Sequence, residues 1–560
     1  MNKKKIFYLS LAIISLIIIV FSLTPTSKED LENKPFSWDN VSLYFVMTDR
    51  FYDGDKSNNN SYGRVSIDDK GSTVGTFHGG DIKGLTKKLK EGYFDDLGIN
   101  AIWITSPVEQ IHGFVSGDAQ NSFDHYGYHG YYALDWTSID KNIGTVEEMR
   151  EFVDLAHSKG IRIVLDVVIN HTGYANKVDM ADYNYGEGKW DNWWGKDWIR
   201  IDLPGYDKGG TDDITMNLSG LPDIKTESTK GVDIAPILKT KWAKDLKENN
   251  DSWVIPAAKK YRENLNIPPA EYIINWLSAW VEEFGIDGFR CDTAKHIEVE
   301  HWKNLKTKCN EALNNWRNNN PNSPGAQWTE DFWMTGEVFG QGLEKNYYYD
   351  NGFDSIINFK FPKGDSLDSL EKIYSEYSEK INSDPNFNVL SYISSHDTGM
   401  TRGNMINLGS KLLLAPGGIE IYYGDETNRR PSTNTITTAT DQPSRSDMNW
   451  NDIDEEVLSH WQKLGQFRRN HIAIGAGEHK LIQNSPYAFS RIYKTENYED
   501  KVVIIPYAEE EVTIDVSSIF EEGAEVRDFY SGKKSKVKNG SVTFKPSKNN
   551  IILIELIEKI

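Results

Sequence analysis

An amphipathic helical pattern followed at once by a short apolar run recurs along this chain. Residues 145–160, TVEEMREFVDLAHSKG, open with the capping-box pair Thr145 and Glu148 and close at Gly160. The next run, residues 161–170, is apolar on both faces until its polar end, as a parallel strand covered on each side must be. Repeated helix-then-strand units of this kind predict a parallel α/β fold.

The same unit occurs at residues 89–106 and 271–292. Further apolar runs bring the predicted strands to eight, the number that closes a (β/α)8 TIM barrel. The runs are residues 41–50, 99–106, 161–170, 286–292, 332–339, 353–359, 388–397 and 418–426.

Several predicted strands end in polar or ionisable side chains. In a closed α/β barrel the carboxyl ends of the strands share one face, where the connecting loops build the active site. We therefore expect these side chains to converge at one mouth of the barrel. They are Asp49, Arg50, Asn170, His171, Arg290, Asp292, Glu337, His396, Asp397 and Asp425.

Two stretches depart from the repeat. Residues 173–255 are rich in Gly, Asp, Asn and Trp and too long for a simple loop, so they predict an irregular domain inserted after the third strand. Residues 475–560 carry short alternating runs separated by Gly and Asn turns, which predict a C-terminal antiparallel β-sandwich. The barrel is then formed by residues 36–172 and 256–474.

The charge balance restricts the partners. The 560 residues include 62 Lys and Arg against 83 Asp and Glu, a formal net charge of −21, which argues against nucleic acid as a partner. The chain also contains 17 Trp, 28 Tyr and 23 Phe. Aromatic rings with polar edges suit stacking on sugars, although a core role accounts for most of them.

The N-terminus predicts export. Three lysines precede an uncharged stretch from Ile6 to Ser27, so residues 1–27 are either a signal peptide or a membrane anchor through residues 6–24. The rest of the chain is then periplasmic or extracellular. The only cysteines, Cys291 and Cys309, are expected to be buried thiols, because Cys291 ends a predicted core strand.

Four segments together carry a specific resemblance. They are DVVINH (166–171), GFRCDTAKH (288–296), GEVF (336–339) and ISSHD (393–397). In order and spacing they look like the successive signature segments of the α-amylase family of glycoside hydrolases.

Other segments extend this resemblance over about residues 40–560. LPDIK (221–225) is similar to the family's motif in the inserted domain, and its LPD form resembles α-amylases more than α-1,6-glucosidases or cyclomaltodextrinases. The opening segments, such as YFVMTDRFYDGD and YGYHGYYALDWT, resemble the periplasmic α-amylases of enteric bacteria.

Glycoside hydrolysis with retention needs a carboxylate nucleophile and a carboxylic acid about 5 to 5.5 Å apart. Asp292 and Glu337 end neighbouring predicted strands and can be so placed. The resemblance implies that Asp292 is the nucleophile, Glu337 the general acid and base, and Asp397 the third catalytic carboxylate. Arg290 points to the same side of its strand as Asp292, and its charge would keep the nucleophile ionised.

The resemblance also implies substrate-binding residues. It places His129, Tyr131, His171 and His396 around the sugar next to the cleaved bond, with the tyrosine ring stacked on the sugar face. Lys295 is expected to reach a sugar on the leaving-group side, and Arg290 belongs to the same set. A lone histidine or lysine more often has a purely structural or solvent-exposed role.

Calcium is the expected cofactor, because hard oxygen ligands dominate the candidates. The family resemblance implies one site formed by Asn170, Asp223 and the carbonyl of His296, bracing the cleft. A second site resembles the calcium loop after the first strand of cyclodextrin glycosyltransferases, although such a run can also be a plain polar loop. Its ligands would come from Asp53, Asp55, Asn58, Asn59, Gly79 and Asp81.

These features predict an exported, calcium-dependent, endo-acting α-amylase that hydrolyses α-1,4 bonds of starch, glycogen or maltodextrins by double displacement. An α-glucan is the expected partner, and the protein is expected to be a monomer. A neopullulanase or cyclomaltodextrinase is the alternative in the family, and cyclodextrin glycosyltransferase is disfavoured by the single C-terminal domain. A non-catalytic, amylase-like membrane partner protein is disfavoured by the three intact carboxylates.

Overall fold

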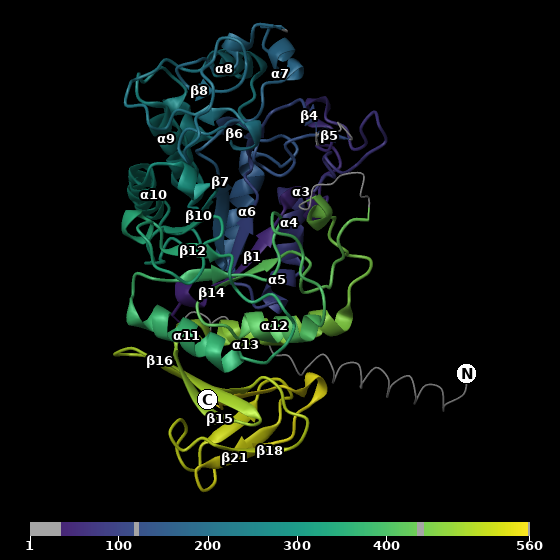
Figure 1. Cartoon of the computed structure of the whole chain (residues 1–560), viewed down its shortest axis with the longest axis vertical. Helices are drawn as coiled ribbons and strands as arrows, with labels where there is room; N and C mark the ends of the chain where they lie inside the picture. Colours follow the sequence, from purple (N-terminus) through teal and green to yellow (C-terminus); the bar gives the residue numbers. More distant parts are fainter. Residues whose placement is uncertain (1–34, 117–122, 187, 434–441, 558–560) are drawn as a thin grey trace, which may run out of the picture. The chain divides into compact units, whose positions relative to one another are not determined.

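The computed structural model describes residues 35–116, 123–186, 188–433 and 442–557 and contains a closed barrel of eight parallel strands (Figure 1). The strands follow one another around the barrel in chain order, and the last pairs with the first, which confirms the predicted (β/α)8 fold. They are β1 (Ser42–Val46), β2 (Ala101–Ile104), β7 (Arg162–Val167), β10 (Gly288–Cys291), β11 (Trp333–Gly336), β12 (Ser355–Asn358), β13 (Val389–Ser391) and β14 (Gly418–Tyr422).

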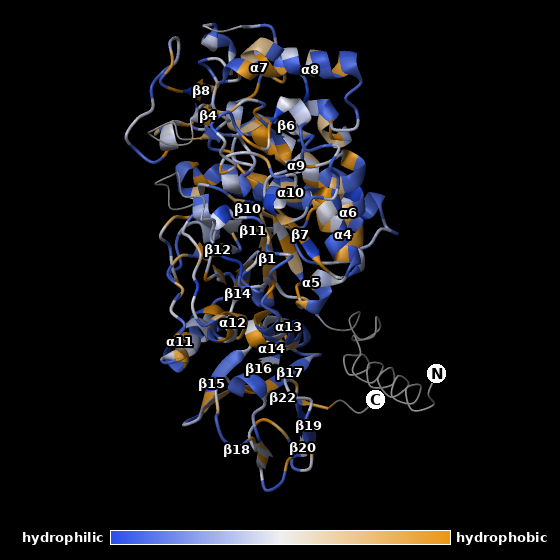
Figure 2. Cartoon of the chain, turned by 90° about the vertical axis from the view of Figure 1, so that its right-hand side faces the viewer, coloured by the Kyte–Doolittle hydropathy of each residue, from blue (hydrophilic) through white to orange (hydrophobic). Residues whose placement is uncertain are grey.

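Helices cover the outside of the barrel. Figure 2 shows hydrophobic residues on the barrel strands and on the helices around them, and all residues of the eight strands are buried. The packing follows from strands that are apolar on both faces and helices with one apolar stripe. The longer helices are α4 (Ile82–Lys90), α6 (Val146–Ser158), α9 (Pro269–Phe284), α10 (Val299–Asn319), α11 (Leu370–Ser383), α12 (Met405–Leu413) and α13 (Glu455–Asn470).

The predicted helix ends agree with the structure at α6 and α9. The α6 helix begins with the capping box of Thr145 and Glu148, and α9 ends at Gly285 in the left-handed conformation. The helix predicted from residues 89–98 is wrong in its extent. It is divided between the end of α4 and the short α5 (Tyr93–Asp96), because Gly92 between them has φ 83°.

The connection from β2 to α6 contains strands that the sequence did not predict. The β3 strand (Val108–Gln110) pairs with β6 (Ala133–Ile139), and β4 (Val115–Ser116) pairs with β5 (Asp124–His125). The β3–β6 pairing shifts register twice within three residues. The β3, β4 and β5 strands have only two or three residues, and the seven-residue β6 mixes polar with apolar residues although it is buried throughout. Neither case gives a sustained alternation of apolar and polar residues.

The segment that follows β7 is irregular. It contains α7 (Lys177–Asp182), α8 (Pro236–Glu248) and the two-residue pair of β8 (Ile199–Arg200) and β9 (Asp223–Ile224). His171, just after β7, forms an isolated bridge with Asp223 of β9. This bridge ties the inserted segment to the carboxyl end of the third barrel strand.

The C-terminal part is antiparallel, as predicted. One sheet has six strands in the order β15-β16-β17-β22-β19-β20, and β18 pairs with β21 in a second sheet. A separate group of buried apolar residues forms the core between these strands. The strands are β15 (Glu478–Asn484), β16 (Tyr487–Lys494), β17 (Glu499–Ile505), β18 (Val512–Asp515), β19 (Glu525–Asp528), β20 (Lys534–Lys536), β21 (Ser541–Phe544) and β22 (Ile552–Leu556).

Cys291 on β10 and Cys309 on α10 are both buried free thiols. Residues 1–27, predicted as a signal peptide or anchor, lie outside the described residues. Among the helices of the described part of the chain, none combines the length and apolar character needed to cross a membrane.

Candidate active site

The ends of β10 and β11 bring two carboxylates to one guanidinium group. Cys291 and Gly336 are register partners in these neighbouring strands. Asp292 and Glu337 follow them directly and therefore leave the sheet side by side. Arg290 Nη1 lies 2.7 Å from Asp292 Oδ1, and Arg290 Nη2 lies 3.1 Å from Glu337 Oε2. Both carboxylates thus face the same space at the mouth of the barrel.

The backbone after β10 makes a further contact with Glu337. Thr293 has φ 48°, a left-handed conformation that is strained for a β-branched residue. Its N–H donates a hydrogen bond of 2.9 Å to Glu337 Oε2. The Glu337 carbonyl in turn accepts a 2.9 Å bond from the N–H of Ala294. The strained residue therefore fixes Glu337 relative to the end of β10.

Burial raises the pKa of both carboxyl groups. It is the largest influence on Asp292, and against the opposing charge of Arg290 it raises the pKa to about 6. Burial likewise raises the pKa of Glu337 to about 7, with Arg290 opposing and the charge of Asp292 adding to the rise. Near neutral pH, Asp292 is therefore mainly ionised, and Glu337 holds a proton more readily than Asp292.

Asp397 follows β13 and remains ionised. Burial acts to raise its pKa, but the contact with His396 and the positive charges of Arg445 and Arg290 hold the pKa well below its ordinary range. Asp397 Oδ1 accepts a 2.9 Å bond from Arg445 Nη2, and Oδ2 lies 3.0 Å from His396 Nε2. Its side chain is 34% exposed, so it can contact a ligand in the cleft.

Asp397 and Glu337 line one small hollow together with Arg290 and Glu420. Glu420 lies on β14, is almost fully buried, and has a pKa that burial raises to about 8. Glu420 was not among the predicted site residues. It sits inside an apolar run, and only the closed barrel brings it beneath the strand ends.

Asp166 on β7 is a second residue for which the sequence analysis predicted no role. It is the register partner of Arg290, and its Oδ1 lies 2.9 Å from Arg290 Nη1. Its Oδ2 accepts hydrogen bonds from the Tyr131 hydroxyl at 2.8 Å and from Trp103 Nε1 at 3.2 Å. Asp166 thereby positions both the guanidinium group and the Tyr131 ring. Its place inside the segment DVVINH was the available signal.

Four predicted substrate-binding residues lie together. The Tyr131 ring stacks on His129 with centroids 5.3 Å apart and on His396 at 5.5 Å. The Tyr131 hydroxyl lies 2.7 Å from His396 Nε2, and its carbonyl lies 3.1 Å from His171 Nε2. The aromatic stack therefore extends from the β13 end toward the β7 end of the mouth.

Lys295 lies apart from this stack. It belongs to the short 3-10 helix Ala294–His296, and its side chain is 37% exposed. Its Nζ lies 3.4 Å from Asp213 Oδ1 in the inserted segment. This position is at the edge of the cleft, between the end of β10 and the inserted segment.

Calcium is the ion expected in this fold, and the residues of the first predicted site fit it. Asp223 Oδ1 is buried and makes no hydrogen bond with any described group, while Oδ2 meets Arg200. The Asn170 carbonyl already accepts a 2.9 Å bond from Ile224, which holds Asn170 beside Asp223. Burial raises the pKa of Asp223 to about 7, and the nearby charge of Glu298 adds to this rise. An unpaired buried carboxylate oxygen in such surroundings suits a hard cation.

His296, the third predicted ligand, is buried, and its Nδ1 lies 2.6 Å from the Asp213 carbonyl. Its ring is thus used within the protein, which leaves the backbone carbonyl for a cation. Glu298, two residues on, has a buried Oε2 without a hydrogen-bond partner among the described groups. Glu298 was not among the predicted ligands of this site.

The second predicted site fits a cation better still. Asp53 Oδ1, Asn58 Oδ1 and Asn59 Oδ1 are all buried and without hydrogen-bond donors among the described groups. Asn59 Nδ2 donates to Asp53 Oδ2 at 2.9 Å, so the loop is held closed around these oxygens. Several oxygen atoms that lie close together and accept no hydrogen bonds are the ligands that suit Ca²⁺.

Gly79 and Asp81 complete this loop. A Cβ at position 79 would come within 2.7 Å of the Asn59 side chain, so glycine is required there. Asp81 is buried, and burial raises its pKa to about 6. Both Asp81 oxygens accept backbone hydrogen bonds, Oδ1 from Gly54 and Gly84 and Oδ2 from Asp55. The carboxylate of Asp55 contacts Lys83 and Ser57. The structure therefore does not bring the Asp55 side chain together with the unpaired oxygens.

Comparisons with known proteins agree with this geometry. The model of the family "Alpha amylase, catalytic domain" matches residues 45–463. A periplasmic alpha-amylase of Escherichia coli (strain K12) is 42% identical over 519 residues, which cover 84% of this chain and 72% of that protein.

Solved structures support the fold. An Anoxybacillus alpha-amylase has a TM-score of 0.61 at 22% identity, covering 94% of this chain and all of that one. A cyclomaltodextrin glucanotransferase with a three-domain ABC distribution has a TM-score of 0.62 at 20% identity, covering 93% of this chain and 99% of that one. With the family model matched across the barrel, the chain belongs to the α-amylase family of glycoside hydrolases.

Proposed function

We propose that this protein is an endo-acting α-amylase that hydrolyses α-1,4 bonds of starch, glycogen or maltodextrins with retention. The observation that carries the proposal is that Asp292 and Glu337 contact the two terminal nitrogens of one guanidinium group, in a chain of the α-amylase family. Shared contact with Arg290 brings the two carboxyl groups to one bond, as a retaining mechanism needs.

In the first step an oxygen of Asp292 attacks the anomeric carbon. Glu337 donates its proton to the glycosidic oxygen, so the bond to the leaving glucan breaks and a glycosyl ester of Asp292 forms. In the second step Glu337 takes a proton from water, whose oxygen attacks the same carbon and releases the Asp292 carboxylate. The higher pKa of Glu337 suits it to the proton-transfer role.

The neighbouring residues have positioning and binding roles in this proposal. The ionised Asp397 accepts hydrogen bonds from the sugar hydroxyls and stabilises positive charge at the transition state. Tyr131 stacks on the sugar, and His129, His171 and His396 surround its edge. Lys295 binds a glucose unit on the leaving-group side.

The pH profile follows from the paired carboxyl groups. Activity needs Asp292 ionised, so kcat/KM should fall as pH decreases through about 6. Activity also needs Glu337 protonated, so kcat/KM should fall as pH rises through about 7. Initial rates on maltoheptaose from pH 4 to 9 should therefore give a narrow bell. A profile flat across this range contradicts the assignment of the pair.

We further propose that Ca²⁺ occupies both cation sites. Asn170, Asp223 and the His296 carbonyl hold one ion between barrel and inserted segment. The other ion is held by the loop after β1, with Asp55 contributing through its backbone. Calcium supplies oxygen coordination and no reactive group. The residues proposed to hold the ion in the loop after β1 are Asp53, Asp55, Asn58, Asn59, Gly79 and Asp81.

Removal of calcium should destabilise the protein. Asp53→Asn removes a charge from the loop site, so the rise in Tm produced by millimolar Ca²⁺ should be several degrees smaller than in the unchanged protein. Asp69→Asn, an exposed aspartate of a nearby loop, is the matched control. Differential scanning calorimetry with and without a chelator measures the effect. An equal calcium response in both variants would exclude the loop as a site.

The remaining assignments are also proposals. Residues 36–172 and 256–474 form the catalytic domain, residues 173–255 an inserted domain, and residues 475–560 a C-terminal domain. We infer export to the periplasm or cell exterior, since the E. coli relative is described as periplasmic. Residues 1–27 are the export signal or anchor, and the protein acts as a monomer on its α-glucan.

A product time course on amylose, pullulan and soluble starch tests the activity. An endo-amylase loses iodine staining early and yields mixed maltooligosaccharides, whereas a neopullulanase releases panose from pullulan. Cyclodextrin formation is measured as well, because a three-domain cyclomaltodextrin glucanotransferase shares this fold over 93% of the chain. The single C-terminal domain therefore does not exclude that activity. Panose or cyclodextrins as the main product would overturn the proposal.

A further inference from the structure

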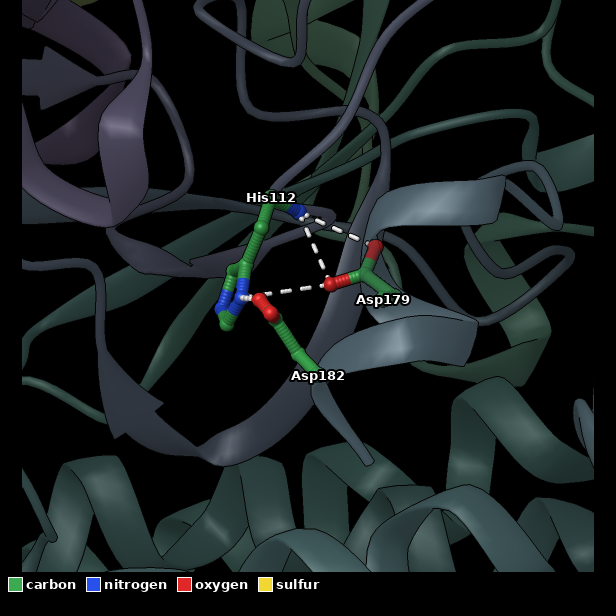
Figure 3. A group of neighbouring side chains, drawn as sticks. All are labelled: His112, Asp179 and Asp182. Carbon is green, nitrogen blue, oxygen red and sulfur yellow. Dashed lines mark hydrogen bonds and ion pairs between the residues drawn. The ribbon is translucent and has the colours of Figure 1, made fainter. Parts of the chain in front are cut away.

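A group of metal-ligating side chains shares no residue with the catalytic carboxylates or with either proposed calcium site. His112, Asp179 and Asp182 offer ligand atoms that all lie within 4.8 Å of one another, and Figure 3 shows the three side chains pointing toward a common centre. His112 follows β3, and the aspartates are on α7, so the group joins two segments that the barrel does not connect directly.

The His112 ring is held in one orientation. Its Nε2 lies 2.9 Å from Glu109 Oε1, and Glu109 Oε2 lies 2.8 Å from Lys241 Nζ. The Tyr62 ring stacks on the imidazole with centroids 3.9 Å apart and planes 16° apart. A histidine that donates one ring N–H to a carboxylate presents its other nitrogen as a metal ligand.

The nitrogen so presented, Nδ1, has no hydrogen bond. His112 is only 5% exposed, and Nδ1 meets hydrogen-bond geometry with none of the described groups. It nevertheless lies 3.2 Å from Asp179 Oδ1 and 3.6 Å from Asp182 Oδ2. These are ion-pair contacts if the ring is protonated, whereas with a neutral ring the buried nitrogen and the two carboxylates can share one cation between them.

The aspartates are positioned from the protein side. Asp179 is fixed by the Asn176 side chain, which caps α7 and donates to Asp179 Oδ2 at 2.5 Å. The backbone N–H of His112 donates to both Asp179 oxygens at 3.2 and 3.1 Å. Asp182 is 43% exposed and faces a cavity of about 410 Å³ that His112 also lines. Solvent can thus reach the centre of the group from one side.

The spacing fits a tetrahedral ion. Metal–ligand bonds of about 2.0 to 2.2 Å place tetrahedral ligands about 3.3 to 3.6 Å apart, close to the distances from Nδ1 to the two carboxylates. One imidazole nitrogen with carboxylate oxygens suits Zn²⁺ and similar transition ions, whereas Ca²⁺ takes six to eight oxygen ligands.

We propose that His112, Asp179 and Asp182 bind one Zn²⁺ or a similar divalent transition ion, with water from the cavity as the fourth ligand. Glu109 orients the His112 ring through its contact with Nε2, and Asn176 orients the Asp179 carboxylate. The ion links the segment after β3 to α7 and thereby braces the inserted segment. It is separate from the calcium sites and takes no part in glycoside cleavage.

The carboxylates around His112 favour a positive charge beside them, either a bound metal ion or a proton on the ring. Burial lowers the pKa of His112, but Asp179, Asp182 and Glu109 together raise it to about 9. A second proton on the imidazole therefore competes with the metal ion for His112 Nδ1. An imidazolium paired with the carboxylates would bind no zinc, so the two occupants are distinguished by a direct measurement of bound metal.

The test uses the full chain in excess Ca²⁺, so that the calcium sites stay filled. Zn²⁺ is added, unbound metal is removed by gel filtration, and bound zinc is counted by mass spectrometry. Co²⁺ added instead should give the intense visible absorption of a tetrahedral site with a nitrogen ligand. We expect one zinc per chain and a rise in Tm of a few degrees.

Asp182→Asn is the decisive variant, because this half-exposed side chain can be changed without disturbing the packing of the core. It should lose at least tenfold in zinc affinity and lose the cobalt spectrum, while the calcium-dependent Tm and glucan hydrolysis stay unchanged. Asp202→Asn is the matched control: its side chain is in the same inserted segment, 80% exposed, and pairs with Lys208. It should bind zinc normally.

Three outcomes overturn the proposal. The unchanged protein could bind no stoichiometric zinc, which would identify His112 as a structural imidazolium. Zinc could bind equally well to Asp182→Asn, which would place it in another site such as a calcium loop. Cobalt could bind with the weak spectrum of an all-oxygen octahedral site, which would exclude His112 as a ligand.

Discussion

Asp292→Asn should lower kcat for amylose by on the order of 10⁴-fold or more, the scale seen when a residue that acts in a catalytic unit is removed. The amide is nearly the same size as the carboxylate but cannot form the glycosyl ester. It also cannot complete the ion pair with Arg290 that is seen at 2.7 Å. Reducing-sugar release under saturating substrate measures the effect, with circular dichroism and Tm as checks of folding.

Asp202→Asn, which makes the same chemical change at an exposed position, should retain full activity. Chemical rescue gives a second readout. With Asp292→Gly and an activated α-maltosyl fluoride, added azide should yield the β-glycosyl azide, since the small anion takes the place of the missing nucleophile. Retention of more than a tenth of the activity in Asp292→Asn would remove Asp292 from the mechanism.

Glu337→Gln should reduce hydrolysis of amylose by about 10² to 10⁴-fold, the usual contribution of general acid–base catalysis. The loss should depend on the leaving group. The dinitrophenolate group of a dinitrophenyl α-maltoside leaves without protonation. The first step on this substrate should therefore remain fast and release a burst of dinitrophenolate. The second step should stay slow, because no base activates water, and the glycosyl ester of Asp292 should accumulate.

Intact-protein mass spectrometry after rapid acid quenching detects this ester. Its mass should exceed that of the free protein by one maltosyl unit, and the added mass should map to the peptide that contains Asp292. An equal loss of rate on both substrates, with no burst, would show that Glu337 does not protonate the leaving group. Glu344→Gln makes the same chemical change at an exposed position of the following segment and controls for the loss of one negative charge.

The sequence predicted most of the barrel because its evidence was local. The capping box at Thr145 and the apolar stripe of α9 specify helix starts and faces without any knowledge of the tertiary structure. Polar residues at strand ends predicted the mouth, since a barrel sends all carboxyl ends to one face. The unpaired oxygens of Asp53, Asn58 and Asn59 agree with the loop that the resemblance suggested.

Other features depend on partners far away in the chain and could not be predicted. Glu420 is an isolated acid in an apolar run, and only its neighbours across the barrel reveal its burial. The Nδ1 of His112 meets Asp179 because a short irregular strand and a helix of the inserted segment pack together. Gly92 could have been read as a break, but a glycine within a helical pattern is often tolerated.

The pairing of β1 with β14 joins Ser42 to Ile419 and Phe45 to Tyr422. During synthesis, about two-thirds of the 560-residue chain therefore separates β1 from β14, its second neighbour in the barrel. Until β14 is made, both margins of the growing sheet have free backbone groups that can pair with another chain. A topology with contacts this distant in sequence folds slowly, so yield should depend on chaperones that shield the nascent sheet more than on the final stability of the barrel.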